Sequence, residues 1–592
     1  MRKIMINCNT NNLDEFRKLA EFAKKIGATH VNISQVETAM WQWDLDRTDP
    51  YPNWGMNNAT LFKVALPKAL EKYIPADYAA RNLEMFSKRA EILKEYGLKA
   101  MFVGMEPAWL PNEAYRDHPS WRGPRCDQPR RARNEYYAPC TDNPEVQALY
   151  AESMKKLCSV IPVEYFEFLT NDSGGGVCWA SLLYPGANGP TACRHTSIGD
   201  KVTNFLTVLQ EAAASVGVKA EVGYRRQFTG EEMSSIVPKL KEGQFCQGKY
   251  KDASFSTKMI GLPDYRDCSY PINGLAGIVG IAEQMTDACN DSNCNISILL
   301  KDMNQKETMQ LIVDNIDTIE NSTMGKYRAL YKSAVSLIGE KYADKLVDMW
   351  EYMQKAYDRM EFWNVGGHLT ELGTVHQRWL TRPLVAFESE LSDEEKSYYR
   401  PFLFQAGTEE EAENLVNMQA TIWLGGESAR INFRNCSRMA IIDIKNAVDI
   451  IDELLSKDDI GDYKEDLREQ KLRLRLLAYI FRNQKNVITF QSIMDRTDKT
   501  EVAEDKTIVI DEQGDKRFYK VMAILREEID NTYEIIKILD EAKTNILNCT
   551  PTEEEETIMQ FGPDIRNDLM KKVDIMERHK LEFERLFKSY NR

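Results

Sequence analysis

The stretch Tyr-Phe-Glu-Phe-Leu-Thr-Asn-Asp-Ser-Gly-Gly-Gly at residues 165–176 joins a short aromatic run to an abrupt polar end. The run from Tyr165 to Leu169 is typical of a buried β-strand, and the three glycines indicate a loop whose backbone approaches another group closely. Asp172 therefore follows the carboxyl end of a strand, where a (β/α)8 barrel carries its functional side chains. The alternative is that Asp172 and Ser173 cap the next turn, a common role for these residue types.

Strand-like runs alternate with amphipathic helical stretches through the first 300 residues or so. The predicted strands are 2–8, 29–37, 99–105, 163–170, 218–224, 244–249, 273–280 and 295–301. Eight strand–helix units of this kind predict an α/β fold with a (β/α)8 barrel in residues 1–310. An open doubly wound sheet is the alternative. The long loops after strands two, three and four favour the closed barrel, because functional loops of that fold share one face.

The composition of the chain changes near residue 305. Before it lie 20 of the 31 glycines and 17 of the 21 prolines, and after it apolar and charged residues alternate at helical spacing. Residues 311–592 are therefore predicted to form an all-α helical bundle domain, with two sub-bundles divided near 400–410. A bundle of this size and acidity could supply a dimer interface, so a homodimer is one expectation for the assembly.

The 592-residue chain carries a formal net charge of −15, which argues against a nucleic acid or an anionic membrane as partner. No apolar run approaches the roughly 18–20 residues that cross a bilayer. Twelve cysteines without the spacing of a disulfide framework fit a reducing compartment. The chain as written is expected in the cytoplasm, or in the periplasm if a signal peptide has been removed, and no cofactor is expected.

Carboxylates follow several of the predicted strands. Glu106 follows strand three, Asp172 strand four, Asp252 strand six and Asp302 strand eight. All four are candidate catalytic residues, because the carboxyl ends of barrel strands meet at one rim. Two carboxylates facing a glycosidic bond suffice for its hydrolysis, one as acid and the other as base or nucleophile. Asp172 is the predicted general acid and one of the others its partner; taken singly, each could instead orient substrate or stabilise the fold.

Tryptophans and one amide are predicted to bind a sugar at the same rim. Tryptophan rings on barrel loops suit stacking against pyranose faces, although they also pack long loops together. The candidate residues of this kind are Trp41, Trp43, Trp109, Trp179 and Asn171.

The loop after strand three holds six arginines, no lysine and two acidic residues between residues 116 and 133. Arginine binds carboxylate and sulfate groups in planar, bidentate geometry. The pattern predicts an acidic sugar, such as a uronate or a sulfated residue. The equal alternative is that the arginines tie the loop to backbone carbonyls and carboxylates. The substrate-binding candidates are Arg125, Arg130, Arg131, Arg194 and Arg225.

The loops after strands three and four also contain four cysteines and two histidines, namely Cys126, Cys140, Cys178, Cys193, His118 and His195. A metal site built from them is one hypothesis. The chain lacks a Cys-x-x-Cys pair in these loops, so the favoured interpretation is that the cysteines are buried small hydrophobic residues. No metal ligand is assigned on this basis.

Several segments together resemble a known group of proteins. They are 168–174, 178–179, 184–190, 193–194, 128–131, 138–140 and 373–384. Over about residues 1–400 the chain resembles barrel proteins of bacterial glycan-utilisation systems, which are distantly similar to hexosaminidases and α-glucuronidases. Hexosaminidases of that kind carry Asp-Glu after strand four, where this chain has Asn171-Asp172. The resemblance implies that Asp172 is a shorter counterpart of the acid in relatives that carry Asn-Glu there.

The segment 373–384 is bounded by glycine and proline inside the helical half. Its residues His376 and Arg378 are candidates for reaching the barrel mouth, with a role between the two domains as the alternative. The first hypothesis is thus a glycoside hydrolase acting on an oligo- or polysaccharide with an acidic or amino sugar. A catalytically silent glycan-binding or scaffold protein is the second, and a metal-dependent barrel enzyme the third.

Overall fold

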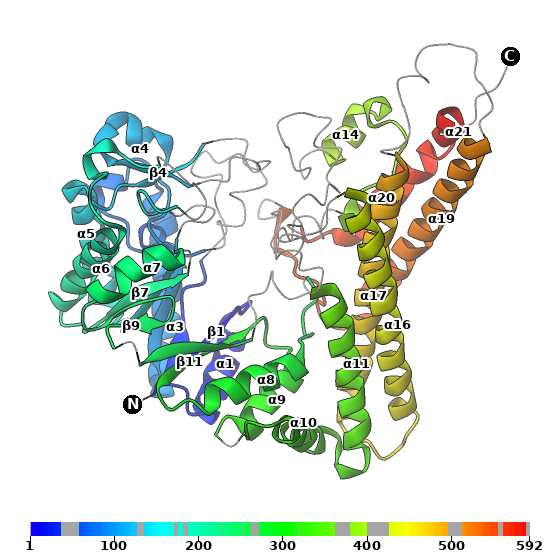
Figure 1. The fold of residues 1–592 in the computed structure, drawn as a ribbon, viewed down its shortest axis with the longest axis horizontal. Helices are drawn as coiled ribbons and strands as arrows, with labels where there is room; N and C mark the ends of the chain where they lie inside the picture. Colours follow the sequence, from blue (N-terminus) through cyan, green and yellow to red (C-terminus); the bar gives the residue numbers. More distant parts are fainter. Residues whose placement is uncertain are drawn as a thin grey trace. The chain divides into compact units, whose positions relative to one another are not determined.

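The computed structural model describes residues 2–36, 58–126, 135–170, 176–181, 188–226, 228–252, 254–261, 271–317, 319–361, 379–399, 426–494, 512–553 and 561–587 (Figure 1). The chain forms two compact units. The first consists of Met1–Leu262, Glu283–Met303 and Asn315–Lys326, and the second of Pro263–Ala282, Asn304–Asp314 and Tyr327–Arg592. The chain therefore passes between the units several times, whereas the sequence predicted one boundary near residue 310.

A closed barrel of nine strands forms the core of the first unit, in the order β1-β11-β10-β9-β8-β7-β6-β3-β2. The strands are β1 (Ile4–Cys8), β2 (His30–Asn32), β3 (Lys99–Met105), β6 (Tyr165–Leu169), β7 (Glu221–Arg226), β8 (Gln244–Cys246), β9 (Lys249–Tyr250), β10 (Ser256–Ile260) and β11 (Cys294–Leu300). Neighbouring strands pair in parallel except at β9, which runs antiparallel to both β8 and β10. The barrel is therefore mixed, with one short reversed strand.

The reversed strand lies where the sequence predicted one continuous strand, 244–249. Gln247 and Gly248 follow β8 with φ of 47° and 72°. Two consecutive residues with positive φ form the tight turn of a two-residue hairpin, so the chain turns back into β9. The predicted strand at 273–280 is wrong, because α8 (Ile278–Cys289) begins inside it. The barrel uses β10 instead, whose Ser-Thr-Lys start offers no apolar run for sequence analysis to detect.

Helices of the first unit alternate with the strands (Figure 1). They include α1 (Leu13–Lys25), α2 (Leu61–Val64), α3 (Ala76–Glu95), α5 (Pro144–Val160), α6 (Ile198–Ala214) and α7 (Gly230–Ile236). Local sequence fixes their starts: the Asn143 side chain accepts from the N–H groups of Glu145 and Val146, and Pro144 occupies the first turn of α5. A small antiparallel sheet of β4 (Arg122–Arg125) and β5 (Tyr137–Pro139) lies in the loop after β3.

The barrel interior is filled by side chains from strands that are not neighbours in the sheet. One buried cluster joins Met5, Met101, Tyr165 and Phe245, from β1, β3, β6 and β8. Because β1 is not adjacent to β6 or β8, these side chains meet inside the barrel. The residues between them in β6, Phe166 and Phe168, face outward, where both rings pack on Phe102. This alternation decides which strand residues face the barrel axis.

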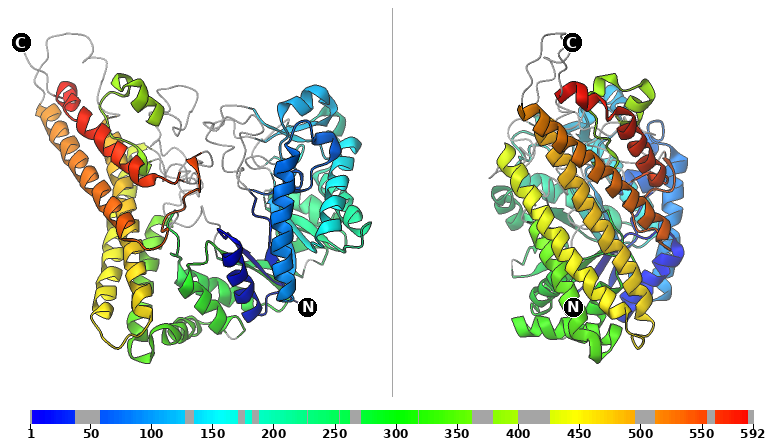
Figure 2. Two further views of the ribbon diagram at one scale, coloured as in Figure 1. Left: turned by 180° about the vertical axis from the view of Figure 1, so that it is seen from behind. Right: turned by 90° about the vertical axis from the view of Figure 1, so that its right-hand side faces the viewer.

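The second unit is a helical bundle, as the composition of the second half predicted. Its long helices are α11 (Ala343–Glu361), α16 (Gly426–Leu455), α17 (Tyr463–Met494) and α19 (Glu512–Glu541), with α11 packed on α16, α16 on α17 and α17 on α19 (Figure 2). Shorter helices include α14 (Asp393–Tyr399), α20 (Ile565–His579) and α21 (Glu582–Phe587). The predicted division near 400–410 lies outside the described residues. Within the described helices, none is both long and apolar enough to span a membrane.

Candidate functional site

The candidate site is the end of the barrel at which β3 and β6 finish. These strands pair in register, with Met105 opposite Leu169, and the Glu106 N–H donates to the Leu169 carbonyl at 2.9 Å. β6 ends at Leu169, and Thr170, the last described residue here, lies two residues before the predicted acid in the sequence. Eight of the predicted site residues lie outside the described residues, namely Asn171, Asp172, Trp41, Trp43, Arg130, Arg131, His376 and Arg378.

Glu106 is fully buried and faces the helices that surround the barrel. Its Oε1 accepts from the Leu61 N–H at 2.6 Å, at the start of α2. Its Oε2 accepts from the Tyr150 hydroxyl of α5 at 2.8 Å and from the Ala108 N–H at 3.2 Å. Alternation along β3 agrees, since Met101 points inward and Phe102 outward, so Glu106 falls on the outward side. Its contacts join α2 and α5 to the end of β3, and both carboxylate oxygens take part in them.

A buried lysine accompanies Glu106. Lys63 is 1% exposed and its Nζ donates to the Asn58 carbonyl at 2.8 Å. Burial lowers the pKa of Lys63 to about 7, opposed by the charge of Glu106. Burial likewise raises the pKa of Glu106 to about 7, opposed by its hydrogen bonds from Leu61, Tyr150 and Ala108. Desolvation is thus the dominant influence on both groups, which is expected where a structural pair is sealed from water.

Asp302 and Asp252 lie at opposite ends of the barrel. Asp302 follows β11, which is parallel to β1 and β10, so it shares the rim reached by β6. In the ring of strands, β11 lies across the barrel from β6. Asp252 follows the reversed strand β9 and precedes β10, and it is exposed at the amino ends of the parallel strands. It there accepts from the Ser254 N–H and hydroxyl, so the prediction that it shares the rim is corrected.

Sequence reasoning missed one carboxylate, Glu167. It lies in β6 two residues after Tyr165, and alternation therefore directs it into the barrel. Its exposed fraction is 7%, which makes it a buried acid inside the barrel and below the rim. The signal in the sequence was an acidic residue in the middle of an otherwise apolar strand, because glutamate is almost never fully buried unless it is paired.

The described tryptophans pack the loops together. Trp109 is 2% exposed and contacts the Tyr136 ring at 6.4 Å between centroids. Trp179 is half-buried, and its Nε1 donates to the Pro190 carbonyl at 3.1 Å. Arg194 lies over the Trp179 ring at 5.7 Å. Loop packing, the alternative left open by the sequence, thus describes both tryptophans.

The described arginines differ in how they are engaged. Arg125 forms an ion pair with Glu135 at 2.9 Å, and its backbone N–H donates to the Asn188 side chain at 2.9 Å. Arg125 therefore helps to join the loops after β3 and β6. Arg225, near the end of β7, is half-buried and its Nη2 lies 3.1 Å from the Met259 sulfur of β10. Since β7 and β10 are not paired strands, this contact crosses the barrel.

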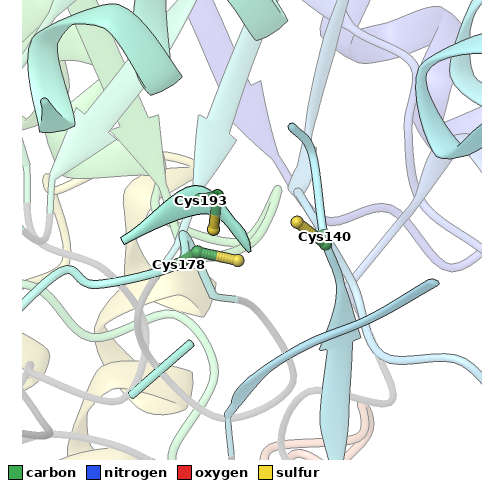
Figure 3. A group of neighbouring side chains, drawn as sticks. All are labelled: Cys140, Cys178 and Cys193. Atoms are coloured by element: carbon green, nitrogen blue, oxygen red, sulfur yellow. The ribbon is translucent and has the colours of Figure 1, made fainter. Parts of the chain in front are cut away.

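Three cysteines from the loops after β3 and β6 meet in one place (Figure 3). Cys140, Cys178 and Cys193 are all buried, and their sulfur atoms lie within 4.8 Å of one another. Within the described ranges the group has these three members, and Cys126 is not among them. Lys201 of α6 adjoins the group: its Nζ donates to the Cys193 carbonyl at 2.6 Å and forms an ion pair with Asp142.

The three thiols have unequal acidity. Hydrogen bonding from Cys178 and the charge of Lys201 lower the pKa of Cys193 to about 6, against the effect of burial. A hydrogen bond from the Cys178 thiol also lowers the pKa of Cys140. The pKa of Cys178 itself is raised, because it donates to both neighbours. The arrangement favours negative charge on Cys193.

Comparison with solved structures places the fold among known enzymes. A GH138 enzyme targeting pectin rhamnogalacturonan II is similar with a TM-score of 0.52 and 9% identity, covering 98% of this chain and 83% of its own. An O-GlcNAc hydrolase mutant from Thermobaculum terrenum covers 98% of this chain and 96% of its own, with a TM-score of 0.38 and 10% identity. At 9% identity the first similarity is one of fold.

A scan against protein-family models gave no match, and a comparison with curated proteins gave none either. The fold, a barrel with a helical unit, is thus shared with a glycoside hydrolase.

Proposed function

We propose that this chain is a glycoside hydrolase whose reaction takes place at the carboxyl end of β6. The observation that carries the proposal is a closed barrel, shared in fold with a glycoside hydrolase, in which β6 ends at Leu169, three residues before Asp172 in the sequence. Barrel enzymes hold their reacting groups at this end of the strands. Asp172 is the proposed general acid, because it is the first carboxylate after the strand end.

Asp302 is the proposed partner of Asp172. It was one of three candidates, and the others are disfavoured by their positions. Glu106 faces the surrounding helices, and Asp252 lies at the opposite end of the barrel. Asp302 follows a strand on the far side of the ring from β6, so the two carboxylates would approach a sugar from opposite sides. Paired carboxylates in this relation can serve as acid and as base or nucleophile.

The proposed substrate is an oligosaccharide containing a uronate or a sulfated sugar. This part rests on the arginine-rich loop, of which Arg125 is already paired with Glu135. Arg225 and the arginines outside the described residues are the remaining candidates for binding the anionic group. Arginine suits this task because its planar guanidinium bonds to carboxylate or sulfate through two parallel donors.

The test is incubation of the purified protein with a panel of uronate-containing, sulfated, amino-sugar and neutral oligosaccharides, followed by analysis of the products. The proposal expects new reducing ends with an anionic member, and none with the variant Asp172→Asn/Asp302→Asn. A catalytically silent glycan-binding protein is the second candidate, favoured by Glu106 being committed to structural contacts. It predicts saturable binding to a panel member without any product.

A further inference from the structure

The thiol cluster formed by Cys140, Cys178 and Cys193 has the geometry of a metal site. Their sulfurs point into a common space and lie within 4.8 Å of one another (Figure 3). A tetrahedral zinc ion with bonds of about 2.3 Å requires sulfurs about 3.8 Å apart. The described positions therefore need to close by no more than about 1 Å to reach that arrangement, which a change of side-chain torsion can supply.

Backbone hydrogen bonds fix Cys140 and the turn that carries Cys178. The Cys140 N–H donates to the Trp121 carbonyl at 2.8 Å, and the Asn143 N–H donates to the Cys140 carbonyl at 3.0 Å. Cys178 precedes Trp179, which has a φ of 67°, unusual for a residue other than glycine. The Trp179 N–H donates to the Asn188 carbonyl at 2.8 Å, which fixes this turn. Strained backbone of this kind persists where the surroundings fix it, and such positions gather at functional sites.

Two alternative explanations account for the cluster less well. A disulfide can join two of three thiols and leaves the third unpaired, so it does not explain why three sulfurs converge. Packing as small hydrophobic residues explains their burial, since all three belong to one buried cluster with Trp179 at its edge. That explanation does not require a cation beside the sulfurs. Lys201, whose side chain is 0% exposed, lies beside the group, where its ammonium donates to the Cys193 carbonyl and also pairs with Asp142.

We propose that Cys140, Cys178 and Cys193 bind one Zn²⁺ ion through three thiolates, with a water molecule as the fourth ligand. Binding leaves all three cysteines as thiolates and releases to solvent whatever thiol protons they still carry, so the complex has one net negative charge, with the Lys201 ammonium as its outer partner. The ion joins the loop after β3, which carries Cys140, to the loop after β6, which carries the other two. This inference goes beyond the proposed hydrolase function and does not depend on it.

The experiment measures metal content in the full chain, purified under reducing conditions and then titrated with zinc chloride. We expect one zinc per chain, and at least a tenfold weaker affinity in Cys140→Ser, Cys178→Ser and Cys193→Ser. Cys158→Ser is the matched control, because Cys158 is buried in α5 and belongs to no such cluster. X-ray absorption at the zinc edge should give three sulfur neighbours at about 2.3 Å.

A second measurement keeps the proposal testable if the serine variants fail to fold. Native chain is alkylated with iodoacetamide, with and without a chelator, and labelled cysteines are identified by mass spectrometry. The proposal expects that chelation selectively increases labelling of the three cluster cysteines. It is overturned by absence of zinc binding, by equal zinc binding in the triple serine variant, or by labelling of the three cysteines that is the same with and without the chelator. An intact disulfide between two of the three in native protein also overturns it.

Discussion

The Glu106 N–H donates to the Leu169 carbonyl at 2.9 Å, so the polypeptide leaves β3 and β6 at the same height. The Glu106 side chain, however, points between α2 and α5, while the chain after Leu169 continues toward Asp172. This hydrogen bond joins Glu106, whose side chain contacts the surrounding helices, to β6, the strand that precedes the proposed acid in the sequence. The Glu106 carboxylate is therefore committed to contacts with the surrounding helices.

Replacement of Glu106 by glutamine should destabilise the first unit. Three donors converge on the two carboxylate oxygens, and a glutamine side chain offers one oxygen and one N–H₂ group in their place. At least one of the three donors then faces the N–H₂ group of the glutamine and loses its buried acceptor, which lowers the free energy of unfolding by roughly 1–3 kcal/mol. Urea unfolding measures the change, with the exposed Glu231→Gln as control. A loss no larger than that of the control would contradict the structural role.

Glu106 should also give stability a pH dependence of unusual sign. Burial raises its pKa from 4.5 to about 7, so the folded state keeps a proton that the unfolded state releases. Glu106 therefore makes its full contribution to the free energy of unfolding below pH 4.5, and this contribution falls as the pH rises to about 7. Unfolding free energies measured across this window should decline with pH, and Glu106→Gln should remove that decline. An unchanged slope in the variant would show that other groups cause it.

Lys572 should be critical to the helical unit. Its Nζ donates to the Glu528 carboxylate at 2.5 Å and to the Leu380 carbonyl at 2.9 Å, and both charged side chains are 0% exposed. Lys572→Met leaves a buried carboxylate without a cation, which typically costs about 3–5 kcal/mol. Thermal unfolding should show this loss, with partial recovery in Lys572→Met/Glu528→Gln. The neighbouring, exposed Lys571→Met serves as control, and equal effects of both single changes would refute the argument.

His579 should stabilise the same unit at low pH. Burial opposes its charged form, but hydrogen bonds to Glu582 and Glu395 outweigh burial and raise the pKa of His579 above 6.5. Its contribution is therefore complete below pH 6.5 and disappears as the pH rises through the higher folded pKa. The difference in unfolding free energy between native protein and His579→Gln should shrink from acidic to alkaline pH. A difference that is constant or grows would contradict this sign.

The sequence was sufficient for the main architecture because apolar periodicity marks buried strands and helices. It failed at β9 and β10, since a two-residue turn and a polar strand leave no apolar run. The alternation of inward and outward residues along β3 places Glu106 on the outward side, but the sequence prediction did not use it and counted Glu106 among the rim residues. The sequence placed the three cysteines in a wider set of four cysteines and two histidines, but it could not select these three, because they are distant in sequence and lack a metal-binding spacing. Their convergence is produced by packing of two loops.

The most direct measurement of the central claim compares Asp172→Asn with Asp252→Asn on the best oligosaccharide of the panel. The two variants remove the same charge, Asp252 at the amino ends of the parallel strands and Asp172 in the segment that follows β6 in the sequence. The account predicts that kcat/KM falls by roughly 10²–10⁴ for Asp172→Asn, the range expected for loss of an acid catalyst. Asp252→Asn should stay within about twofold of the native protein, because an exposed turn residue on the far rim does not touch substrate. Unchanged turnover by Asp172→Asn, or an equal loss in both variants, would contradict the account.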